Sequence, residues 1–268
     1  MNITIVSSLK DPASVNIRNK LLESARWKSL DKGYEYKGFR LIEIDASHLY
    51  QDGIDGKMED EGIQSDLIIF VSRHEGKDKR SMLTVHFTGN ISDAKFGGQT
   101  RELAVAAPLA ARALLLSLKS YHDEVTMEAT HHGPSSLHTP SLYVEIGSTK
   151  NQWYLEAPAR TIANAILTLK VTSGRVAIGL GGSHYARRLT KLIFDSDIAF
   201  GHIFPDYALY QVDEFMLQQA FEKSGTSLAY FDPRTSAQQR DRLCHLIQKL
   251  GCTALQEGDI RANSHKNI

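Results

Sequence analysis

The sequence predicts an α/β protein with a mixed, mostly parallel sheet and helices on both sides of it. Two observations carry this prediction. Short apolar, β-branched runs alternate with helical patterns from one end of the chain to the other, which is typical of strands joined by crossover helices. Several of these runs are continuously apolar, as expected of strands that are buried on both faces.

Eight strands and six helices are expected. The strands cover residues 3–7, 39–44, 67–72, 82–87, 124–130, 142–146, 175–180 and 198–204. The helices cover residues 13–25, 100–120, 157–169, 185–194, 213–223 and 236–250. Pro12 and Pro158 suit a first helical turn. Pro108 interrupts the 100–120 pattern, so that helix is expected to be kinked or to begin later.

One antiparallel pair is expected within this sheet. Only about eight residues separate the strand that ends near His132 from the strand that starts near Ser141, and a parallel crossover needs a dozen or more. The 268 residues contain no repeat, low-complexity tract or Pro/Gly/Ser-rich linker. Residues 1–268 are therefore expected to form a single domain.

The composition excludes disordered and collagen-like classes, because 42% of the residues are hydrophobic and 23% are charged. No apolar run is long enough to span a membrane, and the N-terminus shows no signal-peptide pattern. The two cysteines, Cys244 and Cys252, form neither a disulfide framework nor a C-x-x-C pair. A cytoplasmic protein without a membrane partner is expected.

The charges are segregated although 31 basic residues balance 31 acidic ones. Residues 43–66 hold eight acidic residues and one lysine, whereas residues 146–194 hold seven basic residues and one glutamate. Solvated loops and helix faces explain this pattern. A patch that faces a polyanion is the alternative, because phosphate binding requires clustered positive charge.

Six of the eleven histidines lie at or just after the carboxyl end of an expected strand, where ligands bind in open α/β sheets. Each histidine alone has a structural explanation as a capping or core residue. Neutral imidazole is nevertheless the commonest metal ligand, and zinc takes three or four N, O or S donors. No H-E-x-x-H or paired C-x-x-C motif occurs. The six together predict a metal site: His74, His86, His131, His132, His184 and His202.

Strand alternation distinguishes the candidates further. If the pleat continues through residues 124–130, His132 lies on the polar face and His131 on the apolar face. His132 is then the better chemical candidate, and His131 is equally well explained as structural. Glu145 lies opposite the apolar face of its own strand. A carboxylate on a core strand is paired, metal-bound or catalytic.

A glycine-rich turn at residues 179–184 follows a strand and opens a helix, which is where backbone N–H groups cradle phosphates. His184 occupies the sixth position of the dinucleotide fingerprint, and P-loop and serine-hydrolase motifs are missing from the sequence, so no nicotinamide or nucleotide cofactor is expected. Gly181 and Gly182, beside Arg187, Arg188 and Lys191, suit a phosphate or carboxylate instead.

Seven short motifs follow one another along the chain. They are Ser-Arg-His at 72–74, His-Phe-Thr-Gly-Asn at 86–90, Phe-Gly-Gly at 96–98, Thr-His-His-Gly-Pro at 130–134, Glu-Ile-Gly-Ser at 145–148, Gly-Gly-Ser-His-Tyr at 181–185 and Gly-His-Ile at 201–203. In this order and spacing the sequence resembles the archaeal-type D-aminoacyl-tRNA deacylases, which also occur in plants. One departure is that Arg187 stands where the family usually has proline after Gly-Gly-x-His-Tyr-Ala.

The resemblance implies a three-layer α/β/α sandwich of the phosphorylase/hydrolase-like type, related in shape to bacterial peptidyl-tRNA hydrolase. It also implies hydrolysis of the ester that joins a D-amino acid to the 3′ end of tRNA, with zinc as the cofactor, two ions in the family. The residues alone leave two other classes open. One is a zinc amidohydrolase or peptidase on the same fold, and the other is a non-enzymatic RNA-binding module with structural histidines.

The deacylase hypothesis gives each candidate a role. Zinc would be held by some of His86, His132, Glu145, His184 and His202 and would lower the pKa of its bound water to about 7. Glu145 or His131 would carry the proton to the departing ribose oxygen. Asn90 or the N–H groups of Gly181 and Gly182 would stabilise the oxyanion. The tRNA phosphates would contact Arg160, Arg187, Arg188 and Lys191.

Overall fold

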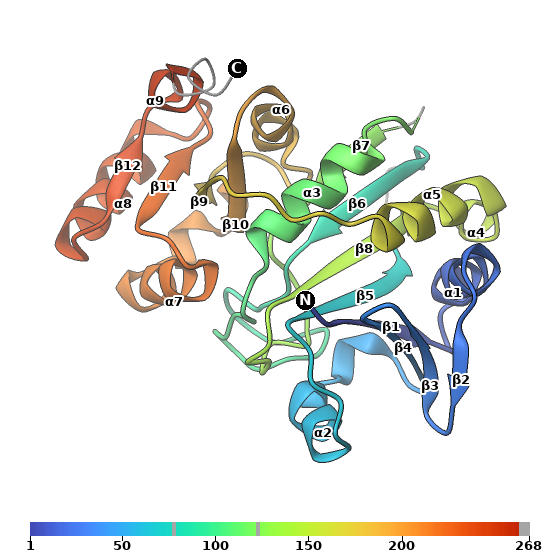
Figure 1. Cartoon of the computed structure of the whole chain (residues 1–268). Coiled ribbons are helices and arrows are strands. Elements are labelled where there is room, and N and C mark those ends of the chain that lie inside the picture. The colour runs from blue at the N-terminus through green and yellow to red at the C-terminus, as the bar shows by residue number, and fades with distance from the viewer. Residues whose placement is uncertain (77–78, 122–123, 263–268) are drawn as a thin grey trace.

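The computed structural model describes residues 1–76, 79–121 and 124–262 and has the α/β architecture that the sequence predicts (Figure 1). Within these residues the strands form two sheets. The larger sheet has eight strands in the order β2-β3-β4-β1-β5-β8-β6-β7, and the smaller one has four in the order β10-β9-β11-β12. Helices pack on both sides of the strands, which gives the three layers of an α/β/α sandwich.

The strands of the larger sheet are β1 (Ile3–Ser8), β2 (Lys28–Leu30), β3 (Gly33–Tyr36), β4 (Phe39–Ile44), β5 (Leu67–Arg73), β6 (Met82–His86), β7 (Glu124–Met127) and β8 (Ser141–Gly147). The strands of the smaller sheet are β9 (Arg175–Leu180), β10 (Ile198–Phe204), β11 (Leu228–Phe231) and β12 (Thr253–Leu255). All pairings in the smaller sheet are parallel.

The α-helices are α1 (Pro12–Ser24), α2 (Ile54–Asp60), α3 (Pro108–Leu118), α4 (Lys150–Trp153), α5 (Glu156–Leu167), α6 (Arg187–Asp195), α7 (Glu214–Ser224), α8 (Ala237–Lys249) and α9 (Glu257–Ala262). Two 3-10 turns, η1 (His48–Tyr50) and η2 (Asp206–Gln211), lie between them. None of the helices in the described ranges is long and apolar enough to cross a bilayer.

All eight predicted strands and all six predicted helices are present, with two corrections. The helix predicted over 100–120 begins at Pro108, which occupies its first turn because proline has no N–H group to donate. The strand predicted over 124–130 ends at Met127. The short strands β2, β3, β11 and β12 and the short helices α2, α4 and α9 were not predicted, because segments of three to seven residues show too little periodicity.

The predicted antiparallel relationship is present, but the two strands that it concerned are not neighbours. β6 lies between β7 and β8 and pairs parallel with β7 and antiparallel with β8. β7 and β8 therefore run in opposite directions without touching. A further antiparallel hairpin, β2-β3-β4, forms the other edge of the sheet.

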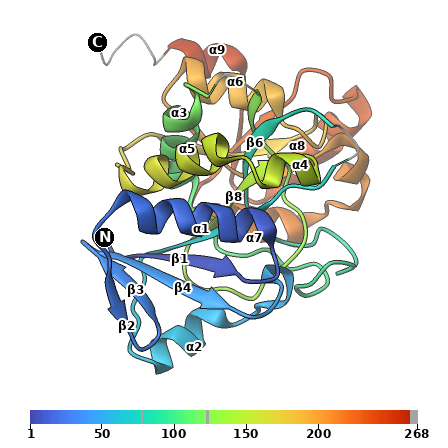
Figure 2. The ribbon, with the colours of Figure 1, turned by 90° about the vertical axis from the view of Figure 1, so that its right-hand side faces the viewer.

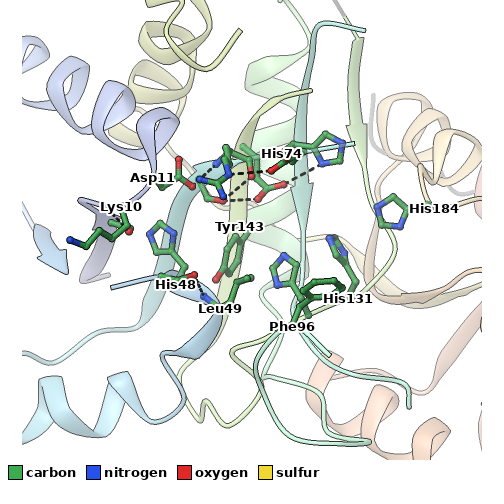
Figure 3. Close-up of a pocket in the computed structure, with 16 residues that line it drawn as sticks. Lys10, Asp11, His48, Leu49, His74, Phe96, His131, Tyr143 and His184 are labelled. Atoms are coloured by element: carbon green, nitrogen blue, oxygen red, sulfur yellow. Dashed lines mark hydrogen bonds and ion pairs between the residues drawn. The ribbon is translucent and has the colours of Figure 1, made fainter. Parts of the chain in front are cut away.

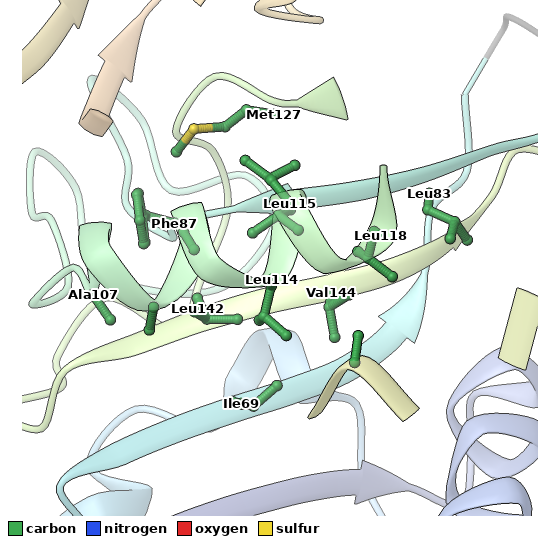
Figure 4. Packing of buried hydrophobic residues seen from close by; sticks show 14 of the residues in the cluster. Ile69, Leu83, Phe87, Ala107, Leu114, Leu115, Leu118, Met127, Leu142 and Val144 are labelled. Carbon is green, nitrogen blue, oxygen red and sulfur yellow. The ribbon is translucent and has the colours of Figure 1, made fainter. Parts of the chain in front are cut away.

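The two faces of the larger sheet are covered differently. Helices α1, α3 and α5 cover one face, and α2 covers part of the other (Figures 1 and 2). Under α3, apolar side chains of β5, β6 and β8 pack against the helix (Figure 4). In this cluster Ile69 and Val144 lie below the helix, Leu83 lies beside the end that carries Leu118, and Leu114, Leu115 and Leu118 belong to the helix itself. Alternation along these strands then points every second side chain to the opposite face.

The segment after β7 connects the two sheets. Ala129 N–H donates to His184 O at 2.8 Å, and Thr130 N–H donates to Ile203 O at 2.9 Å. Glu128 also forms an isolated antiparallel bridge with Tyr185. Residues 128–130 therefore leave the first ladder and bring the turn before α6 against the larger sheet.

Candidate active site

A row of three polar side chains crosses the face of the larger sheet that points away from α3. In the strand register, Ser72 of β5 and Thr84 of β6 flank Glu145 of β8. Ser72 Oγ donates to Glu145 Oε1 at 2.7 Å, and Thr84 Oγ1 donates to Glu145 Oε2 at 3.3 Å. Because Glu145 is only 3% exposed, the sheet itself fixes the orientation of this carboxylate.

His74, directly after β5, lies between two buried glutamates. Its Nδ1 is 3.0 Å from Glu128 Oε1 and 3.6 Å from Glu145 Oε2, while its Nε2 is 2.8 Å from the hydroxyl of Tyr185. Burial alone would lower the pKa of His74, but hydrogen bonds and charge from the two glutamates outweigh it and raise the pKa to about 11. His74 is therefore a cation at neutral pH.

The two glutamates remain ionised in this surrounding. Burial acts to raise the pKa of each, but the neighbouring histidines outweigh it. Hydrogen bonds from His184 and His74 lower the pKa of Glu128 well below its usual value, and His86 and His74 lower the pKa of Glu145. The site thus combines two carboxylates with the His74 cation, and the imidazole of His86, whose pKa is also raised, lies 3.6 Å from Glu145.

Three imidazole rings pack together beside the glutamates. The ring centroids of His86, His131 and His132 lie 4.3 to 4.9 Å apart. Each ring uses Nδ1 to contact a backbone carbonyl, namely Phe87 O, Ala129 O and Gly133 O respectively, at 3.2, 2.8 and 2.7 Å. A carbonyl oxygen only accepts, so Nδ1 carries the proton and Nε2 is the atom available to a metal, as in many metal sites.

The protonation of the three rings differs. Burial and the positive charge of His86 lower the pKa of His131 well below its usual value and that of His132 to about 4, although the His131 side chain is 30% exposed. Burial also acts to lower the pKa of His86, but the charge of Glu145 raises it overall. His131 and His132 are neutral at pH 7, which is the form that binds metal.

Two hydrogen-bond acceptors, a ring nitrogen of His131 and a carboxylate oxygen of Glu128, face each other without a proton between them. A bound cation would suit this arrangement. The unprotonated Nε2 of His131 lies 3.6 Å from Glu128 Oε2. His86 Nε2 is buried and has no hydrogen-bond partner in the described residues, with Glu145 Oε2 3.6 Å away. Nitrogen and oxygen donors of this kind match the preference of zinc. The described donors therefore fit a zinc ion.

Three sets of side chains have their ligand atoms within 4.8 Å of one another. They are His86, His131 and His132; Glu128, His131 and His184; and His74, Glu128 and Glu145. The first two share His131, whose Nδ1 is already bound to Ala129 O. Its single free nitrogen can complete one set at a time. In the second set, His184 Nε2 lies 3.2 Å from Glu128 Oε2.

Five of these side chains line a hollow of about 530 Å³, which we call the main hollow (Figure 3), namely His74, His131, His132, Glu145 and His184. His131 and His184 lie at one end of it, and Lys10, Asp11 and His48 lie at the other. Asp11 caps α1, because its Oδ1 accepts from the N–H groups of the first helical turn. Burial raises the pKa of Asp11 and lowers that of His48 to about 4.

A second hollow of about 280 Å³ adjoins the main hollow at the same histidines. His131 and His132 belong to its lining as well as to that of the main hollow, and so does Phe96. We call it the aromatic hollow, because Phe96, Tyr207 and Tyr210 line it. The histidine pair therefore contributes to both hollows.

Two predicted site residues have different surroundings from the cluster. His202 lies in β10, and its ring nitrogens contact Thr130 Oγ1 at 3.0 Å and Ala104 O at 2.9 Å. It belongs to none of the three sets formed by the described residues. Asn90 lines the aromatic hollow, but its amide nitrogen donates to Gly97 O and Gln99 O at 2.9 and 3.1 Å.

The residues predicted to bind tRNA lie on three elements and have acidic partners. Gly181 and Gly182 have φ values of +95° and +81° in the turn after β9, where they face Asp206, Asp232 and Thr235. The basic side chains of α6 pair as Arg187 with Glu124, Arg188 with Glu257 and Lys191 with Asp195. Arg160 lies on α5 and pairs with Glu23 and Glu156. Packing contacts place α3 against both α5 and α6.

Sequence reasoning missed Glu128 and named His74 only as one of six candidate histidines, without a role in the reaction, although both lie at the centre of the cluster. Glu128 occupies the polar face of its predicted strand, as Glu145 does in the next, and this was the available signal. The pleat argument that separated His131 from His132 was wrong, because β7 ends at Met127 and His132 adopts a φ of +45°. Both histidines therefore reach the cluster.

The fold and the site together define the class of the protein. It is an α/β protein with a cluster of histidines and glutamates, of the kind that can bind a metal ion, at a pocket. The sequence profile described as D-aminoacyl-tRNA deacylase matches residues 61–255, and the chain belongs to this family.

Proteins named D-aminoacyl-tRNA deacylase are similar to nearly all of the chain. The one from Methanosarcina mazei is 42% identical over 97% of this chain and 94% of its own length. The one from Thermococcus kodakarensis is 36% identical over 82% of this chain and 86% of its own length. A solved structure titled as a conserved protein of unknown function, AF0625, superposes with a TM-score of 0.91 at 30% identity, covering 98% of this chain and 97% of the other.

Proposed function

We propose that this chain hydrolyses the ester bond between a D-amino acid and the 3′-terminal ribose of tRNA, in the cytoplasm. The observation that carries the proposal is the set of three histidines whose Nδ1 atoms are bound to backbone carbonyls, close to the ionised Glu128 and Glu145. Two of the three, His131 and His132, line the main hollow. Membership of the D-aminoacyl-tRNA deacylase family supports the choice of substrate.

We assign one zinc ion to the free nitrogens of His86, His131 and His132. When bound, zinc acts as a Lewis acid that activates water and polarises an ester carbonyl. Glu145 is a positioning residue in this assignment, because both of its oxygens are already engaged by Ser72, Thr84 and the neighbouring histidines. Its low pKa makes it a poor proton carrier.

Proton transfer is assigned to His184, with Glu128 as its orienting carboxylate. Glu128 Oε2 accepts from His184 Nε2 at 3.2 Å, which leaves His184 Nδ1 as the acceptor. The His184 side chain is 32% exposed and lines the main hollow, so this nitrogen is accessible to a reacting water and to a leaving oxygen. A carboxylate that orients an imidazole in this way is a common general-base arrangement.

The contacts with tRNA are assigned to α6 and the turn before it. Arg187, Arg188 and Lys191 are 52%, 36% and 62% exposed, and they line one surface depression together with Arg234. Their present ion pairs are exposed and therefore cost little to exchange for phosphate contacts, on the order of 0–1 kcal/mol each. Asn90 acts by holding the loop at residues 97–99 rather than by donating to the oxyanion.

The decisive experiment measures hydrolysis of D- and L-aminoacyl-tRNA by the purified chain, before and after removal of metal by a chelator. We expect rapid release of the D-amino acid, little release of the L-amino acid, loss of activity in chelator and recovery on addition of zinc. Hydrolysis that persists at the full rate in the metal-free protein would contradict the zinc assignment.

Two variants separate the proposed roles. His132→Ala removes a zinc ligand and is expected to lower both bound zinc and activity, whereas His184→Ala lowers activity and leaves one zinc per chain. The matched control is His245→Ala on the exposed side of α8, which changes neither. Two zinc ions per wild-type chain, with one lost in His184→Ala, would instead make Glu128 and His184 metal ligands.

A further inference from the structure

Three large aromatic side chains are exposed to solvent around the aromatic hollow. Phe96, Tyr207 and Tyr210 are 64%, 63% and 67% exposed, and all three line this hollow together with His131 and His132. Phe96 also belongs to the main hollow, where it lies beside His131 (Figure 3). Exposed rings at the wall of a candidate active site require an explanation, because each one leaves apolar area in water.

The backbone that carries Phe96 is held tightly. Its carbonyl accepts from Gly133 N–H at 3.0 Å, and Gly97 O accepts from Asn90 Nδ2 at 2.9 Å. Gly97 lies so close to Leu49 that a Cβ on it would overlap the Leu49 carbonyl. The ring of Phe96 therefore projects from a fixed loop.

The two tyrosines project from η2, which is also anchored. Asp206 N–H donates to Gly182 O at 2.8 Å, and the guanidinium of Arg242 donates to Leu209 O and Val212 O at 2.6 and 2.8 Å. The hydroxyl of Tyr207 lies 3.5 Å from His184 Nδ1. The three rings are thus presented by rigid elements at the margin of the histidine cluster.

We propose that Phe96, Tyr207 and Tyr210 form a stacking subsite for the unpaired bases at the 3′ end of tRNA. This inference rests on the proposed deacylase function. In the ester substrate, the terminal nucleoside and the amino acid lie on opposite sides of the reacting carbonyl. The two hollows adjoin at His131 and His132, which line both, and aromatic rings line the one whereas the charged side chains of His74 and Glu145 line the other. The aromatic hollow therefore takes the nucleoside, and the more polar main hollow takes the aminoacyl group.

The chemistry of the rings favours an RNA end as the occupant. Proteins recognise single-stranded RNA by stacking its bases on aromatic side chains, and every base offers such a face. Exposed aromatic residues also mark protein interfaces. A protein that docked here would cover His131 and His132 and would close the candidate active site, so we assign the surface to the substrate.

The test compares two D-aminoacylated minihelices that carry the tRNA acceptor stem. One ends in adenosine, and the other has a terminal ribose without its base. For the adenosine substrate, Phe96→Leu and Tyr210→Leu are expected to lower kcat/KM by roughly 5- to 100-fold, mainly through KM, as base stacking predicts. On the abasic substrate the two variants should have the same kcat/KM as the wild-type chain. The wild-type chain itself should have a kcat/KM lower by a similar factor on the abasic substrate than on the adenosine substrate.

Two further variants control for indirect effects. Tyr210→Phe keeps the ring and should recover most of the loss. Tyr154→Leu removes a ring that is 59% exposed on the C-terminal side of α4 and lines neither hollow of the described structure, so it should behave as wild type. Because all these side chains are exposed, thermal unfolding should be unchanged in each variant.

The outcomes distinguish this inference from the proposed function. If the wild-type chain hydrolyses neither substrate, the deacylase proposal fails. Binding of the uncharged minihelices with and without the terminal base, measured by fluorescence anisotropy, then still tests stacking. If hydrolysis occurs but the leucine variants keep the wild-type KM, or lose equally on both substrates, the stacking subsite is refuted.

Discussion

His74 and Glu128 form a buried ion pair in which Nδ1 lies 3.0 Å from Oε1, and neither side chain is more than 5% exposed. Glu145 approaches the same nitrogen to 3.6 Å. One protonated imidazole therefore separates two carboxylates that would otherwise face each other in a buried site. This local charge balance lets the cluster exist before any metal is bound.

Replacing His74 should destabilise the metal-free protein. In His74→Gln two buried carboxylates lose their common cation, and we expect the free energy of unfolding at pH 7 to fall by about 3–5 kcal/mol. Urea unfolding in chelator measures this loss. The double variant His74→Gln/Glu145→Gln should be more stable than the sum of the two single changes predicts. Simple additivity would show that the three side chains are not coupled.

Stability should decrease as the pH falls from about 6.5 to about 4. Burial lowers the pKa of His202 and of His48 to about 4, whereas both titrate near 6.5 in the unfolded chain. Between these values only the unfolded chain takes up the protons, so each histidine contributes about 3 kcal/mol at pH 7 that is lost below pH 4. NMR titration of the two rings gives an independent check, because neither should protonate above pH 5 in the folded protein.

Zinc binding should release most of one proton per ion at pH 6. A histidine must lose its proton to bind metal. Burial acts to lower the pKa of His86, but the charge of Glu145 outweighs it and raises the pKa above its usual value, whereas the pKa values of His131 and His132 are lowered, so His86 is the source of that proton at pH 6. Calorimetry in buffers of different ionisation enthalpy counts it. Glu145→Gln should reduce the release, and a binding enthalpy independent of the buffer in the wild-type chain would contradict this assignment.

Two glycines with similar backbone angles should tolerate alanine very differently. Gly97 and Gly53 have φ values of +73° and +68°, but a Cβ on Gly97 meets the Leu49 backbone, whereas a Cβ on Gly53 meets no atom within 4 Å. Gly53→Ala is expected to cost about 1–2 kcal/mol from the left-handed conformation alone. Gly97→Ala should cost more and should also lower activity, because the loop that carries Phe96 must move. Equal unfolding temperatures would contradict the close packing.

The salt dependence of tRNA binding should identify the phosphate contacts. Lys191→Gln and Arg187→Gln are each expected to reduce the slope of log K against log salt by about one. The control is Lys32→Gln, because Lys32 is 60% exposed and lies in the turn between β2 and β3, far from α6 (Figure 1). Arg160→Gln tests whether the tRNA extends over α3 to α5. An unchanged slope in both α6 variants would place the tRNA elsewhere.

The sequence was sufficient to predict the longer strands and helices but neither the shortest elements nor the pairing of the strands. Runs such as 67–72 and 175–180 are long and apolar enough to identify strands locally. The place of β6 between β7 and β8 depends on contacts between residues far apart in the chain, and a local pattern contains no record of them.

The site could be predicted only in part, again because some of its contacts join residues that are far apart in the chain. Strand-end positions singled out His86, His131, His132 and His184, and the structure brings them together. Glu128 was not predicted as a site residue, because residues 128–130 leave the β7 ladder and bind Tyr185, His184 and Ile203 instead. The acidic surroundings of Gly181 and Gly182 come from Asp206 and Asp232, which follow later in the chain. Neither relationship can be read from neighbouring residues.

β6 runs antiparallel to β8, and β5 pairs with the other edge of β8. Glu145 therefore lies within a fully paired part of the sheet, between Ser72 and Thr84, and not in a loop at the end of a strand. The amides around this carboxylate should exchange their hydrogens only when the whole sheet opens. The centre of the site is therefore as resistant to local unfolding as the core of the protein. Substrate binding has to be accommodated by the loops around it, while the carboxylate stays in place.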